Sequence, residues 1–254
     1  QKYLRIFFYR PTGLILNSFL YNMQLFYAPQ MKDGDYFLTE EESRHCARVL
    51  RYQVGQEIHL TDGEGQLAKA LLSEVGKTCR FKIIESKIQA RLPYHIHIAL
   101  APTKQMERTE WFVEKCVELG IQELSFIQCA HSERKHLKAE RIRKIAITAM
   151  KQSLNLHLPL IHPLQSLEAF LEERPKSDQQ FIAYLGEEAK TFLGKLIRPQ
   201  NTYCIMIGPE GDFSPNEVKL ALKHQFMPVS LGDRRYRTET AGLVACHICN
   251  LINQ

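Results

Sequence analysis

The sequence predicts an α/β fold in which a parallel sheet covered by helices is preceded by a small β-barrel. Between Met23 and about Arg91, short β-rich runs are separated by turn residues, a pattern typical of small barrels. After Arg91, apolar strand-like runs alternate with helical segments. This alternation favours a parallel sheet with helices on both faces. We therefore expect two domains, over residues 23–91 and 92–254.

The composition is that of a globular protein of ordinary polarity. The chain has 254 residues, of which 44% are hydrophobic and 24% charged, so it can bury a sizeable core. No apolar run approaches the roughly 18 residues that a membrane span requires, and we expect no membrane partner. Seven dispersed cysteines indicate reduced thiols and a cytoplasmic location. Cys246 and Cys249 form a close pair, but no second ligand pair has matching spacing, so we expect core cysteines and no metal site.

Residues 1–22 differ in character from the rest of the chain. They contain no acid, no clear periodicity and no initiating Met, and no small-residue cleavage site follows them. We interpret them as a vector-derived or upstream-translated leader, with Met23 as the natural start; the alternative is a true N-terminal arm. The leader supplies Lys2, Arg5 and Arg10 to the net charge of +5, which leaves +2 for the remainder. So small a charge permits an RNA partner without arguing for one.

The first domain is expected to contain five strands and one helix. Thr39 can cap the helix and Glu42 stands three residues later, which makes a capping box before residues 43–50. The sequence Asp-Gly-Glu-Gly at residues 62–65 is a good hairpin turn, because glycine tolerates positive φ. The expected strands are residues 24–27, 35–38, 57–61, 66–72 and 80–84.

The second domain begins near Pro93, because proline stops the preceding strand. Its expected strands are residues 96–100, 124–127, 181–185, 203–207 and 227–231. Its expected helices are residues 109–119, 139–154, 167–172, 215–224 and 238–252. Ligands of open α/β sheets bind in loops at the carboxyl ends of strands, so the loops after these strands are the candidate sites.

The first such loop has the sequence Ile-Gly-Pro-Glu-Gly-Asp-Phe-Ser-Pro at residues 207–215. It enters a helix with Ser214 at the N-cap and Pro215 at N1, both favoured there. Gly208 and Gly211 allow main-chain groups to approach a ligand closely. The alternative is an ordinary tight turn between a strand and a helix.

The second loop spans residues 231–241 and holds three arginines within four positions. The alternative is a solvated basic loop with Thr238 or Thr240 as a helix cap. Neither loop has the glycine spacing of Walker or Rossmann phosphate-binding sites, which argues against a nicotinamide or nucleotide-phosphate enzyme.

Together, the two loops resemble the ribosomal RNA small subunit methyltransferase E family, the 16S ribosomal RNA uridine-N3 methyltransferases of the SPOUT superfamily. The shared pattern is Ile-Gly-Pro-Glu-Gly before Phe-Ser-x-x-Glu, then Leu-Gly-x-Arg, then Arg-Thr-Glu-Thr-Ala. The resemblance covers residues 23–254, and residues 45–51 with 62–65 look like the family's PUA-like RNA-binding barrel. Two positions depart from the family: Asp212 stands where it usually has Gly, and Gly242 where it often has Ala.

The resemblance implies a C-terminal trefoil knot and S-adenosylmethionine as the cofactor, held bent in the knot largely by backbone groups. The apolar Leu185, Ile207 and Leu231 would flank the adenine. The implied cofactor-binding residues are Leu185, Gly186, Ile207, Gly208, Glu210, Gly211, Leu231, Gly232, Tyr236, Arg237, Thr238, Thr240 and Ala241. Asp212 would add a carboxylate beside this loop, which leaves its effect on cofactor affinity open.

The implied reaction is methylation of N3 of a specific uridine in 16S ribosomal RNA of the small ribosomal subunit. N3 carries a proton at neutral pH, so we expect Arg237 to stabilise the developing anion and Glu239 to act as a candidate base. Alignment of nitrogen, methyl and sulfur would supply much of the rate. Two alternatives stay open: a knotted RNA methyltransferase that acts on a ribose 2′-OH or another base, and a non-catalytic RNA-binding ribosome assembly factor.

The N3 atom lies on the Watson–Crick edge, so the uridine must be unpaired or flipped out, and a separate RNA-holding surface makes sense. Two basic clusters could provide it. Arg44, Arg48 and Arg51 recur at helical spacing and can form one basic face, although a solvated helix face is the alternative. The second cluster, suited to phosphates, contains Arg134, Lys138 and Arg141, with Lys135, Arg143 and Lys144.

The last expected helix, at residues 238–252, is apolar nearly all round and therefore needs cover on both sides. Family members dimerise through this region, so the resemblance implies a homodimer through the methyltransferase domain. The alternative is burial within one subunit.

Overall fold

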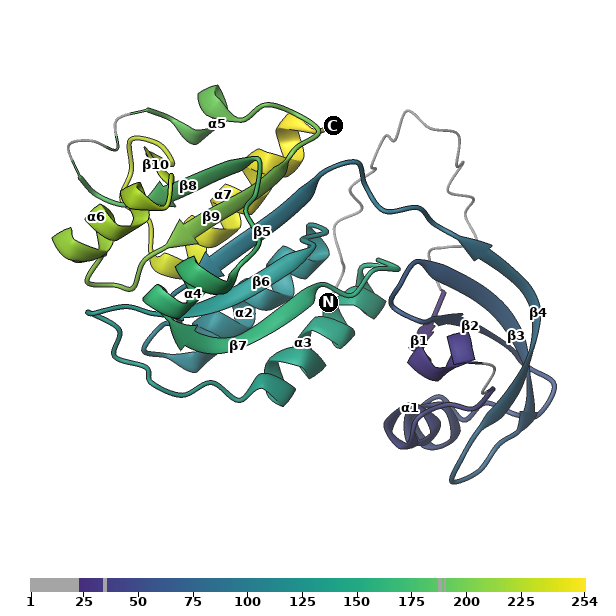
Figure 1. Ribbon diagram of the computed structural model, residues 1–254. Helices are drawn as coiled ribbons and strands as arrows, with labels where there is room; N and C mark the ends of the chain where they lie inside the picture. The colour runs from purple at the N-terminus through teal and green to yellow at the C-terminus, as the bar shows by residue number, and fades with distance from the viewer. Residues whose placement is uncertain (1–22, 34–35, 187–188, 190) are drawn as a thin grey trace.

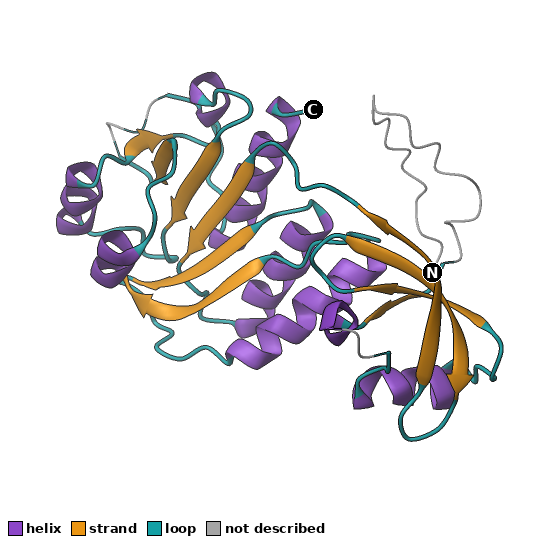
Figure 2. Ribbon diagram, turned by 45° about the vertical axis from the view of Figure 1, so that its right-hand side comes forward, coloured by secondary structure: helices purple, strands orange, loops and turns teal. Residues whose placement is uncertain are grey.

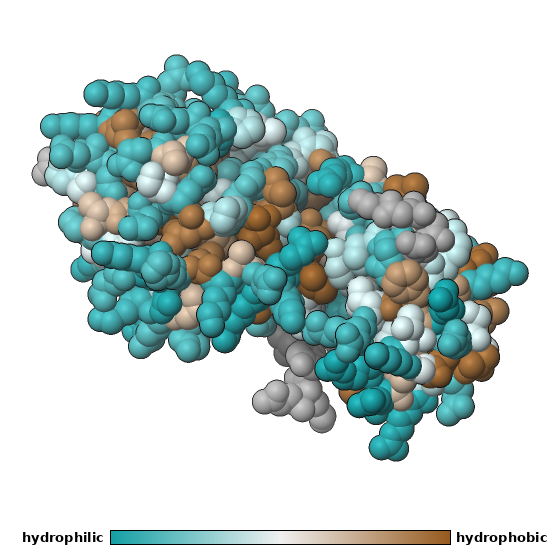
Figure 3. Space-filling model, turned by 60° about the horizontal axis from the view of Figure 1, so that its bottom comes forward, coloured by the Kyte–Doolittle hydropathy of each residue, from teal (hydrophilic) through white to brown (hydrophobic). Residues whose placement is uncertain are grey.

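The computed structural model describes residues 23–33, 36–186, 189 and 191–254, which form two lobes of unequal size (Figure 1). The expected leader at residues 1–22 lies outside the described residues. Each lobe has its own sheet, with four strands in the smaller and six in the larger. No helix in the described residues is long and apolar enough to cross a membrane. The face drawn in Figure 3 is mostly hydrophilic, with an apolar patch near the middle of the larger lobe.

The smaller sheet has the strand order β1-β2-β3-β4 and is strongly curved (Figure 1). Its strands are β1 (Leu25–Tyr27), β2 (Glu57–Thr61), β3 (Gln66–Glu74) and β4 (Arg80–Ile88). β1 runs parallel to β2, and the other pairs are antiparallel. The register between β3 and β4 shifts after Lys69 and after Leu72, and such bulges bend a sheet. The bent sheet encloses a core that includes Phe26, Ile58 and Leu60.

The helix and the second strand expected in this lobe differ from their predicted form. α1 (Glu40–Arg44) begins after Thr39, whose Oγ1 accepts a hydrogen bond from the Glu42 amide at 3.3 Å, as predicted. The reciprocal bond of the predicted capping box is not formed, because Glu42 Oε1 pairs with Lys151 and Oε2 has no hydrogen-bond partner among the described residues. The helix then continues as the π-helical segment η3 (His45–Val49). The strand expected at residues 35–38 is reduced, in its described part, to a bridge between Phe37 and Arg80. A short 3-10 helix, η2 (Pro29–Asp33), precedes it.

The larger sheet is entirely parallel, with the strand order β10-β8-β9-β5-β6-β7. Its strands are β5 (His95–Leu100), β6 (Glu123–Gln128), β7 (Leu160–Ser166), β8 (Gln179–Ala183), β9 (Thr202–Ile207) and β10 (Met227–Val229). The sequence predicted all of them except β7, because Pro163 interrupts its apolar pattern. Proline is tolerated there because β7 is an edge strand.

Helices cover both faces of this sheet (Figures 1 and 2). They are α2 (Met106–Glu118), α3 (Ala139–Gln152), α4 (Leu167–Glu173), α5 (Leu193–Leu196), α6 (Pro215–Lys223) and α7 (Thr238–Ile252). α2, α3 and α7 pack on one face around a core that includes Phe112, Ile142 and Cys246. α4 and α6 cover the other face with Phe170 and Ala221. The predicted α/β class is confirmed, whereas the trefoil knot stays a prediction.

The hairpin turn between β2 and β3 ties the two lobes together. The Leu158 amide donates to the Gly63 carbonyl at 2.8 Å, and the Gly65 amide donates to the Leu156 carbonyl at 2.9 Å. Gly65 has a φ of +108°, and a Cβ there would lie 2.5 Å from the His157 ring, so glycine is required twice over. These main-chain bonds fix the β-rich lobe against the amino ends of the strands of the larger sheet. The arrowheads in Figures 1 and 2 mark the opposite, carboxyl ends.

Three histidines surround one glutamate near the amino ends of β5, β6 and β7. His95 Nε2 and His162 Nε2 each lie 2.7 Å from an oxygen of Glu123, and His97 Nδ1 lies 3.6 Å from that carboxylate. Burial lowers the pKa of His97 to about 4, so this ring is neutral at pH 7. Burial would raise the pKa of Glu123, but its histidine neighbours outweigh that effect and lower the pKa to about 2.

We predict that His97 makes the fold sensitive to mild acid. Unfolding restores the ordinary pKa of His97 near 6.5, so between about pH 6.5 and pH 4 only the unfolded chain takes up this proton. Stability therefore falls as the pH is lowered through this window, by on the order of 2 kcal/mol at pH 4.5. Urea unfolding at pH 7.5 and pH 4.5 should show a smaller loss in His97→Gln than in the wild type. The control is the exposed His136→Gln, and equal losses in all three proteins would contradict the assignment to His97.

Candidate functional site

The predicted cofactor residues meet at one edge of the larger sheet. β10, β8 and β9 are adjacent and parallel, so the loops that follow them emerge side by side. Two hydrogen bonds join these loops: the Leu185 amide donates to Asp212 Oδ2 at 2.9 Å, and Thr238 Oγ1 donates to the Gly208 carbonyl at 3.1 Å. Residues that lie far apart in the sequence therefore line one edge, at the carboxyl ends of the strands.

The loop after β9 is tightly packed against its neighbours. Ile207 is buried, and a Cβ at Gly208 would lie 3.0 Å from the Phe213 ring. A Cβ at Gly211 would lie 3.0 Å from His131 Cβ, in the loop after β6. Glu210 is exposed, and its Oε1 accepts a hydrogen bond from the Lys104 amide at 3.0 Å. Gly208 is itself buried, whereas Gly211 is exposed. The glycines therefore let this loop pack closely on Phe213 and His131, while the approach of a ligand to its main chain stays a prediction.

The loop after β10 leads into the amino end of α7. Ser230 Oγ donates to the Gly232 carbonyl and accepts from the Gly232 amide, which holds Gly232 at a φ of +134°. Leu231 and Gly232 are partly buried, whereas Tyr236 and Arg237 are exposed. Arg237 is the N-cap of α7, and no side chain caps the first turn of the helix. Unpartnered amides and the positive end of the helix dipole therefore remain beside Gly208.

Glu239 is the unusual residue of this edge. Its side chain is only 9% exposed, Oε1 lies 3.9 Å from Arg108 Nε, and Oε2 has no hydrogen-bond partner. A buried carboxylate oxygen without a partner is costly, so this atom is suited to accept a hydrogen bond from a ligand. Thr240 and Ala241 follow it and are partly buried. The sequence did not single out Arg108, because its position early in α2 becomes relevant only when α2 packs beside α7.

The predicted RNA-binding face on α1 is only partly formed. Arg44 and Arg48 are exposed, and Arg44 pairs with Glu40 at 3.2 Å on the same helix. Arg51 does not continue a helical face: it follows the π-helical segment and has a left-handed φ of 56°. The expectation that all three arginines share one helical face is therefore wrong, because the spacing argument assumed a continuous α-helix.

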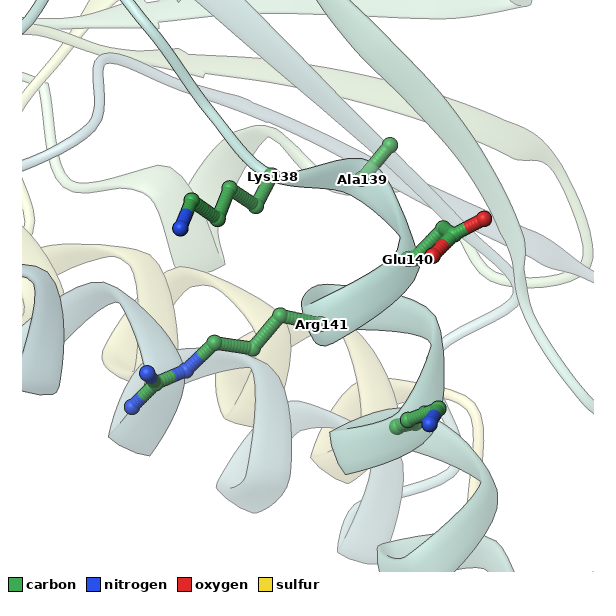
Figure 4. A pocket seen from close by; sticks show the side chains of 5 residues that line it. Lys138, Ala139, Glu140 and Arg141 are labelled. Carbon is green, nitrogen blue, oxygen red and sulfur yellow. The ribbon is translucent and has the colours of Figure 1, made fainter.

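The second basic cluster divides into two parts. Arg134 is partly buried, and its guanidinium donates to the main-chain carbonyls of Thr103 at 3.1 Å and Lys104 at 2.5 Å. Lys138 and Arg141 lie at the amino end of α3 beside an open hollow, where they extend to the same side while Glu140 points away (Figure 4). Arg141 also forms a bidentate pair with Glu110 of α2, at 2.5 and 2.8 Å.

Comparisons with known proteins agree with this arrangement. Residues 90–250 match the family described as RNA methyltransferase domain, and residues 38–84 match the RNA methyltransferase PUA domain. Ribosomal RNA small subunit methyltransferase E of Bacillus subtilis is 30% identical, with 82% of this chain and 86% of that protein covered. Its counterpart from Synechocystis is 29% identical, with 90% and 77% covered.

Two solved structures show the same architecture. A probable rRNA-methyltransferase from Porphyromonas gingivalis is 42% identical, covers 91% of this chain and 98% of its own, and has a TM-score of 0.84. The ribosomal RNA small subunit methyltransferase E from Neisseria gonorrhoeae, bound to S-adenosyl methionine, is 27% identical with the same coverage and a TM-score of 0.79. The fold of the six-stranded sheet is thus that of SPOUT methyltransferases, preceded by a PUA-like domain.

We predict that Arg134 stabilises the loop after β5. Arg134→Ala removes two charge-assisted hydrogen bonds to main-chain carbonyls, so the free energy of unfolding should fall by about 1–2 kcal/mol. Urea unfolding measures this loss, and hydrogen exchange should show faster exchange in residues 101–105. Lys135→Ala, at the adjacent exposed position, is the matched control. Equal stability of the two variants would show that the Arg134 guanidinium does not support the loop.

Proposed function

The chain belongs to the ribosomal RNA small subunit methyltransferase E family, and from this premise we propose that it transfers a methyl group from S-adenosylmethionine to N3 of a uridine in 16S ribosomal RNA. One observation carries the proposal. The closely packed main chain at Gly208, the amino end of α7 without a side-chain cap and the unpartnered Glu239 Oε2 converge on one sheet edge. An edge of this kind can hold a polar ligand through backbone groups and reach a reacting base at the same time.

The residues at this edge fit the proposed cofactor. Any side chain at position 208 would press against Phe213, so main chain alone borders that space. The exposed Leu185 and the partly buried Leu231 supply apolar surface on two adjacent loops, suited to the flanks of an adenine, whereas Ile207 at the end of β9 is buried. When bound, S-adenosylmethionine supplies an electrophilic methyl group on its sulfonium. The chain then needs to orient this group and to prepare the nitrogen that attacks it.

The uracil N3 becomes a nucleophile when its proton is lost, and two side chains are placed to assist. The unpartnered Glu239 Oε2 can accept the N3 proton, while Arg108 lies on the other side of the carboxylate. The exposed Arg237 guanidinium, at the N-cap of α7, can stabilise the negative charge that spreads onto the uracil carbonyl oxygens. Because Glu239 is buried, water does not compete with the uracil N3–H for its carboxylate.

The RNA itself needs a holding surface outside the reaction edge. The exposed Arg44 and Arg48 on the β-rich lobe, and Lys138 and Arg141 on α3, are the basic side chains that we propose for phosphate contact. Contacts of this kind position an RNA without reading its sequence.

The exposed apolar residues suggest a further assembly. Leu251 on α7 is 59% exposed and Trp111 on α2 is 40% exposed, although both are large and apolar. We propose that α2 and α7, which pack against each other, contribute these side chains to a homodimer interface, in the cytoplasm where the ribosomal RNA is found. The competing function is methylation of a ribose 2′-OH or another base by the same edge, which the first experiment below distinguishes.

The proposed reaction is tested by mapping the product. We incubate the purified protein with methyl-labelled S-adenosylmethionine and small-subunit RNA that lacks modifications. Mass spectrometry of the nucleosides should identify 3-methyluridine. A label on a ribose or on another base would show that the enzyme has a different target atom. Calorimetry in the same preparation should show binding of S-adenosylmethionine, and its absence at millimolar ligand would refute the enzyme function altogether.

We predict that Arg237 and Glu239 act on the methyl transfer itself. Arg237→Ala and Glu239→Gln should each lower the single-turnover rate by about 10²-fold or more, because each removes a group that assists the charged nitrogen. Thermal melting should be unchanged in Arg237→Ala, since this side chain is exposed. Arg235→Ala is the control for loss of one positive charge in the same loop. A single-turnover rate in Arg237→Ala equal to that of this control would remove Arg237 from the mechanism.

A further inference from the structure

Asp212 lies at the junction of three loops on the candidate edge. Its φ is +61°, a left-handed conformation that is uncommon for a residue with a Cβ, although Asp tolerates it better than most. Such a conformation persists when the surroundings hold it in place. The contacts of Asp212 show what holds it.

Both carboxylate oxygens of Asp212 bind main-chain amides. Oδ2 accepts from the Leu185 amide, in the loop after β8, at 2.9 Å, and Oδ1 accepts from the Phe213 amide at 2.8 Å. The main-chain carbonyl of Asp212 accepts from His131 Nδ1, in the loop after β6, at 3.0 Å. One residue therefore connects the loops after β6, β8 and β9.

The hydrogen bond to Leu185 reaches a residue whose own side chain packs little. The Leu185 side chain is 68% exposed, so its burial contributes little to its position. A carboxylate that accepts from a backbone amide forms a charge-assisted hydrogen bond, stronger than a neutral one. Asp212 thus ties the main chain at Leu185 to the loop after β9.

We propose that Asp212 is a positioning residue for the methyl donor: it clamps the loop after β8 to the loop after β9 and so presets the relative placement of the main chain at Leu185 and in the Gly208 loop. This inference rests on the proposed function, which places S-adenosylmethionine between these loops. A loop arrangement set before binding avoids the entropic cost of ordering loops around the ligand. Both carboxylate oxygens already accept from main-chain amides, so Asp212 acts by positioning the loops and not by contact with the methyl donor.

Substitution of Asp212 by glycine tests the clamp without straining the backbone. Asp212→Gly adopts the left-handed conformation freely and removes only the side-chain bonds, so relief of backbone strain partly offsets their loss and the melting temperature should change by only a few degrees. S-adenosylmethionine should bind roughly five- to tenfold more weakly by calorimetry, because the ligand must then order the loop that Asp212 holds in the wild type. The KM for S-adenosylmethionine should rise by the same factor, while kcat at saturation changes by less than about twofold.

Two further variants separate the clamp from simple charge. Asp212→Asn tolerates the left-handed backbone and keeps one acceptor oxygen, so its binding should fall between wild type and Asp212→Gly. Asp233→Asn neutralises an exposed carboxylate in the loop after β10 and should bind S-adenosylmethionine like the wild type. An effect in Asp233→Asn equal to that of Asp212→Gly would assign the change to long-range charge and overturn the clamp.

Hydrogen exchange of the cofactor-free protein gives a readout independent of activity. The Leu185 amide should be protected in the wild type, partly protected in Asp212→Asn and unprotected in Asp212→Gly. Unchanged Leu185 exchange in Asp212→Gly, or wild-type affinity for S-adenosylmethionine in that variant, would overturn the proposal. Failure of the proposed function looks different: the wild type would bind no S-adenosylmethionine, although Leu185 protection still depended on Asp212.

Discussion

The parallel pairing of β10, β8 and β9 forces three strand-end loops onto one edge of the sheet, and the site depends on how these loops are held there. Three carboxylates at the start of α6 and in the loop before it tie the loop after β9 to the loops after β5, β6 and β8. Glu210 accepts from the Lys104 amide after β5, Asp212 from the Leu185 amide after β8, and Glu217 from the Ala130 amide after β6, at 2.7 to 3.0 Å. Each is a charge-assisted bond from a side chain to a neighbouring main chain. The loop after β9 therefore positions its neighbours, while its own glycines let it pack closely against Phe213 and His131.

The regular elements of both sheets were largely predictable, because their hydrophobic periodicity is local information. α7 begins and ends where the sequence predicts, at residues 238 and 252. Ser214 is the N-cap of α6, as predicted. β7 was missed because Pro163 breaks the apolar pattern of a strand whose edge position the sequence cannot reveal. The strand expected at residues 35–38 did not form a regular strand in its described part. Its residues suit a strand, and Tyr36 and Leu38 bond the main chain of Phe81 and Cys79, but the pairing extends no further than a single bridge at Phe37.

The site was predictable where a residue's own chemistry decides its role, and not where a distant partner decides it. The glycines of the loop after β9 indicated a closely packed main chain, and in the structure they pack against Phe213 and His131, while the predicted approach of a ligand stays a prediction. Arg134 looked like a free phosphate ligand in the sequence, but carbonyls thirty residues earlier in the chain bind its guanidinium. No sequence pattern marks Arg108 as a site residue, and its proposed role is visible only because the buried Glu239 lies beside it in the structure.

The two departures from the family pattern have separate physical explanations, and both concern the placement of α7 and the loops around it. A Cβ at Gly242 would lie 2.5 Å from the Phe112 ring and 2.9 Å from Leu100 Cδ1, so α7 packs closely on α2 and the end of β5. Overpacking of this kind costs about 1–3 kcal/mol, more than the helix propensity that alanine would add. Close packing brings the first turn of α7 to Gly208, where Thr238 binds the carbonyl. Asp212 holds the opposite side of the same loop, so the two unusual residues support one main-chain segment from two directions.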